Sequence, residues 1–454
     1  MTTTTNNDAT ITTNPYLEGN YAPVVEEVTA HDLPVEGDLP DALVGTLLRD
    51  GPNPYGQVDA TTHHWFLGDG MVHGIRIEDG RAAWYRNRWI RTPALAEKAG
   101  FPAPPPSPIN AAFSGSGSVN VLAHQGRILA CGEVGLPYQL TPELDTIGQF
   151  DFGGTVGTNI TAHPKVDPVT GELLAFGYDF GPTNLRYHRI SPDGVAVQTE
   201  VIDTPAPTMM HDFGVTATRI VFMDLPVVFD ADRLGRGMPF RWDPSYGARL
   251  GVMPRDGGNA DVQWIEIEPC YVFHPLNAHD DGDRIVMDVV RHPTMFASSE
   301  IGPGEPTPPT LDRWVIDTVA GTVTETRLDD RPQEFPRVDE RLTGRPHRFG
   351  YAVELQASNA FDTAGIVKQD LVAGTSAVHR VGPGRMASEA VFVPAHPTAG
   401  EDEGWLVAPV YDRATDRSDI IVVDAGDVTA PPVATIHLPV RIPFGFHGSW
   451  VPST

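Results

Sequence analysis

The residues best able to do chemistry in this chain are histidines, of which there are 16. Four of them share a context: each follows an apolar, strand-like run and is bracketed by glycine, proline or aromatic residues. They are His163 in NITAHPK, His211 in PTMMHDFG, His274 in CYVFHPLNA and His447 in IPFGFHGSW. Imidazole is a good ligand for iron, zinc, copper and nickel. These four are therefore candidate metal ligands, although spacing alone leaves open that each is an ordinary core residue.

Other histidines carry weaker signals. His63 and His64 lie in a polar turn, His279 lies in NAHDDGD, and His396 lies in PAHPTAGEDEG. Histidines in polar contexts are usually solvated or satisfied by neighbouring groups. We interpret these four as ordinary surface or core residues.

For residues so far apart to meet, the fold must bring remote strand ends together. Segments rich in Val, Ile and aromatic residues cover the chain and are bounded by Gly, Pro, Asp and Asn. Several repeat one phrase of strand, Asp/Gly turn and strand, as in DPVTGELLAF and DTVAGTVTETRL. This predicts an all-β propeller made by one domain over residues 1–454, with strand ends on one axis. A pair of β-sandwiches is the alternative, and the repeat is too degenerate to count blades.

Two segments depart from the strand pattern. PALAEKAG, residues 93–100, predicts a short helix. The N-terminus, residues 1–14, lacks a basic region followed by an apolar run, so we expect a disordered tail and not a signal peptide.

Composition narrows the class of partner. The formal net charge of −27 repels phosphate, which argues against nucleic acid and leaves a neutral, apolar or cationic small ligand open. Cys131 and Cys270 are the only cysteines, too few for a disulfide framework or a Cys-rich zinc site, and they fit a reducing cytoplasm. No apolar stretch approaches the roughly 20 residues that span a bilayer. Nothing in the sequence indicates an obligate protein partner.

One segment stands out from the acidic remainder. Gly100–Phe113, GFPAPPPSPINAAF, is apolar, rich in proline and uncharged. It could be an exposed patch that makes peripheral contact with a membrane and admits a water-insoluble substrate. An ordinary loop packed on the protein is the alternative.

The histidine segments are also part of a longer resemblance. GTLLRDGPNP, GDGMVHGIRIEDG, RNRWIRT, TAHPKVDPVTGEL, MHDFGVT, SEAVFVPAHP and FGFHGSW occur in the order typical of the carotenoid cleavage oxygenases. That family includes carotenoid, apocarotenoid and lignostilbene dioxygenases and the retinal pigment epithelium isomerase. The resemblance extends from NPYLEGNYAPVVEE to the C-terminus, and the motifs together are very specific.

The resemblance implies a seven-bladed propeller with an axial ferrous ion, and above the ion a dome of loops and short helices that encloses an apolar tunnel. It implies that His163, His211, His274 and His447 bind the iron. Four neutral ligands leave the ion its full charge and open positions, so O2 can bind beside a substrate that never ligates the metal. The activity implied is that of a non-haem iron(II) dioxygenase, which cleaves one C=C bond into two carbonyl products.

The family also implies residues around the ligands. Glu133, Glu334 and Glu389 match the glutamates that accept a hydrogen bond from ligand histidines, and Glu133 and Glu389 are expected inside apolar strands, where a lone carboxylate would be costly. Val119 stands where family members often have a threonine near an open iron position. The candidate tunnel residues, each of which could instead be plain core, are Trp65, Trp89, Phe273, Phe296, Phe446 and Trp450, together with Val119.

Three functions remain for comparison. Stilbene-cleaving relatives typically have a lysine before the first glutamate and a tyrosine upstream, which hold a phenol; here Gly132 precedes Glu133. No tyrosine lies between Tyr85 and Tyr138, and the only lysine there is Lys98. A carotenoid or apocarotenoid is therefore the expected substrate. Stilbene or phenylpropene cleavage is the alternative, and a non-enzymatic propeller that binds partners does not explain the four histidines.

Overall fold

Burial patterns explain why the strands stack as they do. The computed structural model describes residues 14–109, 114–180, 185–297, 307–356 and 359–453. Strand β11 (Leu173–Tyr178) is buried at every position, whereas β13 (Ala196–Ile202), at the edge of the same sheet, alternates half-buried and exposed positions up to its last residue, the buried Ile202. Strands inside a blade lie between two neighbouring sheets, whereas an edge strand faces water on one side.

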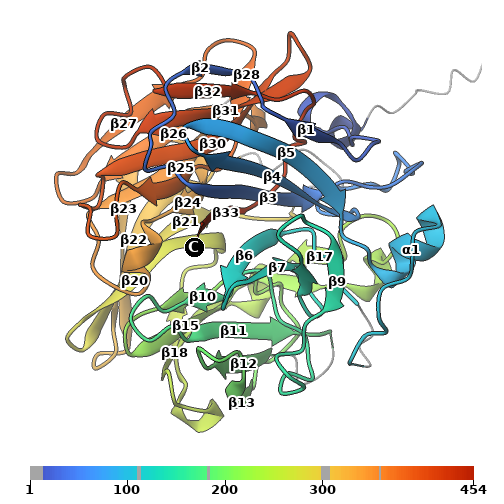
Figure 1. Ribbon diagram of the computed structural model, residues 1–454. Helices are drawn as coiled ribbons and strands as arrows, with labels where there is room; N and C mark the ends of the chain where they lie inside the picture. The colour runs from blue at the N-terminus through green and yellow to red at the C-terminus, as the bar shows by residue number, and fades with distance from the viewer. Residues whose placement is uncertain (1–13, 110–113, 181–184, 298–306, 357–358, 454) are drawn as a thin grey trace, which may run out of the picture.

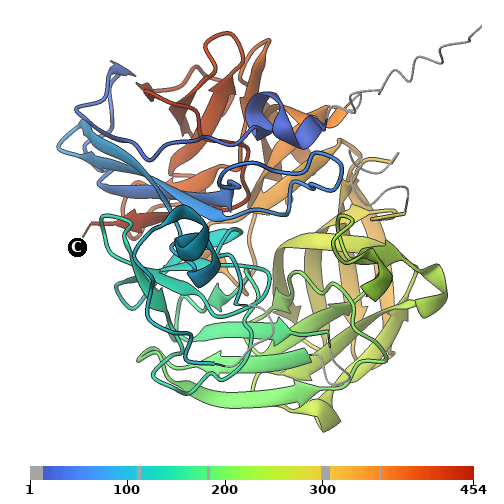
Figure 2. The same ribbon diagram turned by 90° about the vertical axis from the view of Figure 1, so that its right-hand side faces the viewer.

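Seven antiparallel sheets are arranged radially as the blades of a propeller (Figures 1 and 2). Blade 1 contains β33 (Gly448–Pro452), β3 (Gly45–Pro52), β4 (Gly70–Glu78), β5 (Arg81–Trp89) and β1 (Thr29–His31). Blade 2 contains β6 (Asn120–His124), β7 (Arg127–Cys131), β8 (Tyr138–Leu140) and β9 (Thr146–Gln149). Blade 3 contains β10 (Lys165–Val166), β11, β12 (Leu185–Ile190) and β13. Blade 4 contains β14 (Gly214–Val215), β15 (Arg219–Asp224), β18 (Ala248–Pro254) and β19 (Gln263–Ile267).

The remaining blades follow in chain order. Blade 5 contains β20 (Tyr271–Asp281), β21 (Arg284–His292), β22 (Thr310–Asp317) and β23 (Thr322–Asp329). Blade 6 contains β24 (Gln333–Arg337), β25 (Phe349–Gln356), β26 (Asn359–Asp370) and β27 (Thr375–Arg380). Blade 7 contains β28 (Arg385–Ala387), β29 (Val391–Pro394), β30 (Gly404–Asp412), β31 (Arg417–Asp424), β32 (Ala434–His437) and β2 (Val35–Gly37).

The two ends of the chain close the ring. The C-terminal strand β33 pairs with the N-terminal strand β3 in blade 1, and the N-terminal strand β2 pairs with β32 in blade 7. In Figure 2 blue and red segments accordingly lie side by side. A buried cluster joins Leu47 and Ile75 of blade 1 to Val407 and Ile420 of blade 7. This packing fixes the inner strands around the axis, where side chains from remote segments meet.

Helices and a hairpin complete the described chain. The α-helix α1 (Pro93–Ala99) starts with Pro93, has its N-terminus capped by the Thr92 hydroxyl and ends at Gly100, whose φ of 70° favours glycine. The 3-10 helices are η1 (Pro15–Leu17), η2 (Gly19–Tyr21), η3 (Ala231–Arg233), η4 (Pro244–Tyr246), η5 (Asn259–Asp261) and η6 (Glu340–Leu342). A separate hairpin consists of β16 (Val227–Phe229) and β17 (Phe240–Trp242). No helix among the described residues is long and apolar enough to cross a membrane.

The expected all-β propeller with seven blades is confirmed, and so is the short helix at PALAEKAG. The alternative of paired sandwiches is wrong, because the sheets surround a common axis instead of packing face to face in pairs. Residues 1–13 of the expected tail lie outside the described residues. Asn14 does not belong to a disordered tail: it is buried, and its side chain caps η1 and donates to the backbone oxygens of Ala60 and His63.

Candidate metal centre

The four candidate histidines occupy equivalent places in four blades. His163 lies two residues before β10, His211 lies three residues before β14, and His447 immediately precedes β33. His274 lies near the start of β20, where irregular pairing with β21 around Pro275 changes the direction of the strand. Because each position is at the axial end of an inner strand, all four rings face the centre of the propeller.

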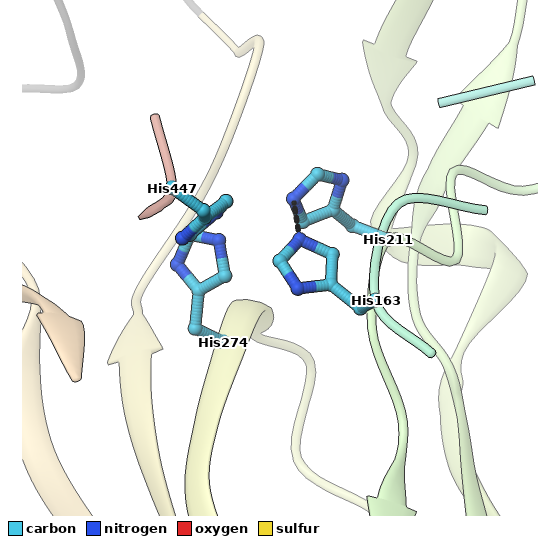
Figure 3. A group of neighbouring side chains, drawn as sticks. All are labelled: His163, His211, His274 and His447. Atoms are coloured by element: carbon cyan, nitrogen blue, oxygen red, sulfur yellow. Dashed lines mark hydrogen bonds between the residues drawn. The ribbon is translucent and has the colours of Figure 1, made fainter. Parts of the chain in front are cut away.

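These rings converge on one point (Figure 3). One ligand atom from each of the four histidines lies within 4.8 Å of the others, and all four residues are buried. The ring centroids of His163 and His447 are 4.6 Å apart, and those of His274 and His447 are 4.7 Å apart. The Nε2 atoms of His163 and His211 are separated by 2.9 Å. The set has the size and donor type of a mononuclear metal site.

Unsatisfied nitrogens support a metal at this point. The Nε2 atoms of His274 and His447 are buried and have no hydrogen-bond partner among the described residues. Burial lowers the pKa of His447 to about 3, and burial with the adjacent rings of His211 and His447 holds the pKa of His163 well below its ordinary value. Neutral rings such as those of His163 and His447, with lone pairs aimed at one point, are what a metal cation requires. His211 differs, because the Glu133 carboxylate outweighs its burial and raises its pKa, so metal binding there displaces a proton.

The three blades without a ligand histidine each supply a glutamate. Nδ1 of His211 donates to Glu133 at 2.7 Å, Nδ1 of His274 to Glu334 at 2.7 Å, and Nδ1 of His447 to Glu389 at 2.7 Å. Each bond places the ring proton on Nδ1 and leaves Nε2 as the metal-binding atom. Glu133 lies two residues after β7 and Glu389 two residues before β29, so the expectation that both are inside strands is wrong, while Glu334 is in β24.

Glu389 is surrounded by positive charge. Its Oε1 accepts hydrogen bonds from Arg337 at 3.1 Å and from the Gly448 amide at 2.9 Å, and Arg49 lies 3.6 Å away. Burial alone would raise the pKa of Glu389, but Arg337, His447 and Arg49 outweigh it and lower that pKa to about 2. The carboxylate therefore stays ionised and acts as a fixed acceptor for His447.

Glu334 depends on local backbone strain. Its neighbour Phe335 has a φ of 56°, which bulky residues rarely adopt, at an irregularity in the β24–β25 pairing. The bend places the Phe335 ring 5.7 Å from the His274 ring and lets Glu334 reach both His274 and Nε2 of His292, the latter at 3.0 Å. Burial opposes ionisation, but the two histidines hold the pKa of Glu334 well below its ordinary value.

An apolar cavity of about 540 Å³ adjoins one side of the centre. His211 and His274 reach it, and so do Glu133 and Glu334. Its aromatic walls include Trp65, Phe66, Phe240, Phe273, Phe335 and Phe446. Trp65 and Phe66 lie in the loop between β3 and β4 of blade 1, Phe446 lies just before β33, and the other three lie in strands β17, β20 and β24. Together these rings enclose a site suited to an apolar ligand.

The tunnel predictions have mixed outcomes. Phe273, Phe296, Phe446, Trp65 and Val119 line this cavity. The Val119 carbonyl also accepts the His447 amide at 3.1 Å, so this residue helps to hold a ligand in place.

Two tryptophans lie elsewhere. The prediction for Trp89 is wrong: its Nε1 donates to the Asn53 carbonyl, and its ring packs in a cluster with Met71 and Leu95, away from the cavity. Trp450 lines a second, more polar cavity of about 400 Å³, which touches His163, His274 and His447.

Several contributing residues escaped the sequence reasoning. Tyr178 donates to Glu133 at 2.6 Å, and Tyr16, Tyr21 and His64 line the apolar cavity. His64, interpreted from its polar turn as an ordinary surface or core residue, is buried. His292 ends an apolar run just as the four ligands do, so the same signal could have found it.

The proline-rich segment is described over residues 100–109, and residues 110–113 lie outside the described part. Pro102, Pro105 and Pro106 are exposed. Phe101 is half-buried: the Arg91 guanidinium lies 3.5 Å from its ring centroid, and Tyr55 packs edge-on at 5.8 Å. The segment thus presents prolines outward and holds its aromatic residue against the protein.

A seven-bladed propeller with four axial histidines and three supporting glutamates defines a metal-binding oxygenase class, and known proteins agree. The family described as retinal pigment epithelial membrane protein matches residues 21–452, so the chain belongs to this carotenoid oxygenase family. It is 44% identical to a Mycobacterium tuberculosis carotenoid cleavage oxygenase, over 97% of this chain and 98% of that protein. It is 35% identical to a Crocus sativus carotenoid 9,10(9',10')-cleavage dioxygenase, over 96% of this chain and 89% of that protein. The crystal structure of Pseudomonas brassicacearum lignostilbene dioxygenase superposes with a TM-score of 0.88 at 30% identity, and the match covers 97% of this chain and 98% of that one.

Proposed function

We propose that this protein is a non-haem iron(II) dioxygenase that cleaves a C=C bond of a carotenoid or apocarotenoid into two carbonyl products. The observation that carries the proposal is the aromatic cavity that ends directly at the four-histidine centre. A ferrous ion bound by these histidines supplies the redox chemistry that activates O2. The named carotenoid-cleaving relatives, at 44% and 35% identity, support the substrate class.

The protein's own residues provide positioning and exclude water. A polyene has no group that can chelate a metal, so its placement depends on the area buried against rings such as Phe273 and Phe446. Glu133, Glu334 and Glu389 orient three ligand rings before substrate arrives. The apolar walls keep bulk water from the reacting bond while leaving room for O2 beside the substrate.

The cavity chemistry also favours a polyene over a phenol. Neither lysine nor arginine is among the described residues that line it. Lys98, the one lysine near the expected clamp position, pairs with Asp69 at 3.6 Å, and its side chain is 48% exposed. Without a cationic partner, a phenolic hydroxyl gains little specific stabilisation here.

Stilbene or phenylpropene cleavage is the second candidate. The structural similarity to lignostilbene dioxygenase and the presence of Tyr16 and Tyr21 in the cavity wall favour it. A phenolic oxygen could interact with a tyrosine hydroxyl even where no lysine is present.

One experiment separates the candidates. Protein loaded anaerobically with Fe(II) is mixed with carotenoids, apocarotenals, resveratrol or isoeugenol under ¹⁸O2, and products are identified by mass spectrometry. We expect labelled aldehydes or ketones from a carotenoid or apocarotenal and poor turnover of both phenols. Efficient resveratrol cleavage with inert apocarotenals would establish the second candidate, and no cleavage by iron-loaded protein would reject both.

A further inference from the structure

One ligand histidine differs from the other three in its surroundings. Nδ1 of His211, His274 and His447 donates to a glutamate at 2.7 Å. Nδ1 of His163 instead faces Oδ2 of Asp212 at 3.5 Å, longer than a hydrogen bond to a carboxylate normally is. Since the Nε2 atom of His163 faces the ligand cluster, its Nδ1 carries the proton in a metal-bound protein, and that proton requires an acceptor.

Asp212 is held rigidly beside this ring. It is buried, and its Oδ1 accepts the Phe213 amide at 2.7 Å. Nζ of Lys165 lies 2.9 Å from each carboxylate oxygen. Lys165 begins β10 and Asp212 precedes β14, so the ion pair connects the two blades that carry His163 and His211.

We propose that Asp212 is a positioning residue for His163, the fourth carboxylate around the metal centre, and that Lys165 weakens its effect. Charge shared with Lys165 makes Asp212 a poorer acceptor than the three glutamates. His163 is therefore the least polarised of the four ligands and the one most easily displaced. The proposal rests on the metal centre proposed above, but not on the substrate.

Two substitutions have opposite expected effects. Asp212→Asn removes the carboxylate and should weaken Co(II) binding by roughly 10-fold. Lys165→Met leaves the Asp212 charge to act on His163 and should strengthen Co(II) binding by roughly threefold or more. A purely structural ion pair predicts loss in both variants, because each breaks the same contact.

The measurements are chelator competition for Co(II), the visible Co(II) spectrum and thermal unfolding of the metal-free protein. Arg189→Met is the matched control, since it breaks a 2.7 Å ion pair with Glu172 in the same blade, away from the ligands. We expect the spectrum to shift in the Asp212 and Lys165 variants and to stay unchanged in the control. The gain from Lys165→Met should vanish when Asp212→Asn is also present.

Equal losses of Co(II) affinity in both single variants would overturn the proposal, as would a gain from Lys165→Met that persists without Asp212. If Asp212→Asn does not fold, the sign of the Lys165→Met effect decides by itself. Wild-type protein that binds no cobalt would reject the metal centre as a whole, whereas failure to cleave carotenoids would leave the inference on Asp212 intact.

Discussion

Glu389 and Glu133 make the same hydrogen bond to a ligand histidine but have different surroundings, so the same substitution should affect them differently. The Glu389 side chain is fully buried against Arg337 and Arg49, whereas the Glu133 side chain is 23% exposed and its other partner is the Tyr178 hydroxyl. Glu389→Gln removes the carboxylate beside the buried Arg49 and one of the two carboxylates that pair with the half-buried Arg337. Arg337 and the Gly448 amide both donate to Oε1 of Glu389. In the glutamine variant this position holds either the NH2 group, which is itself a donor, or the one acceptor oxygen that the side chain still has.

The magnitudes follow from these contacts. Breaking a buried ion pair by removing one partner costs roughly 3–5 kcal/mol. Glu133→Gln keeps an acceptor for Tyr178 and leaves no charge unpaired, so it should cost about 1 kcal/mol. Both variants lose a carboxylate that orients a ligand, and metal affinity should fall roughly 10–100-fold in each.

The assay combines metal competition with thermal unfolding of the metal-free proteins. We expect similar losses of metal affinity and a much larger drop in the unfolding midpoint for Glu389→Gln than for Glu133→Gln. If metal-free Glu389→Gln and Glu133→Gln unfold at the same temperature, the ion pairs of Glu389 with the arginines do not contribute to the stability of the fold. Unchanged metal affinity in both would remove the glutamates from the metal centre.

Further predictions concern the ligands, acid stability and lipid contact. Replacing any one of the four ligand histidines by alanine should lower bound iron and abolish cleavage, so full iron content in one variant, measured by elemental analysis, would exclude that residue as a ligand. Burial, with a smaller effect of Arg186, lowers the pKa of His188 from 6.5 to about 4. Between pH 6.5 and 4 the His188 ring is therefore protonated in the unfolded chain but neutral in the folded protein. The free energy of unfolding that this ring contributes above pH 6.5 is lost as the pH falls through this range. His188→Gln should reduce this slope in equilibrium denaturation by up to about 1.4 kcal/mol per pH unit; an unaltered slope would contradict the assignment. If the proline-rich segment contacts lipid, Pro102→Asp/Pro106→Asp should lower liposome flotation, and equal flotation would leave the segment an ordinary loop.

The sequence by itself was enough to predict the candidate ligands and the kind of fold. Strand phrases ended by Asp/Gly turns are local signals, so the all-β architecture and the short helix at α1 could be predicted. The four histidines and three glutamates were found through motifs whose order resembles a known family. The structure then brought those seven residues together as three His–Glu pairs and one further histidine.

The tertiary structure decided which way each side chain faces and what it meets. Trp65 and Trp89 were both candidates for the cavity wall, yet Trp89 packs beside Met71 and, of the two, only Trp65 reaches the cavity. The left-handed backbone at Phe335 allows Glu334 to contact both His274 and His292, and no local pattern announces that bend. Neighbours such as Asp212 and Lys165 meet only when separate blades pack. Local sequence governs strands and turns, whereas contacts between blades depend on the twist, bulges and closure of the whole ring.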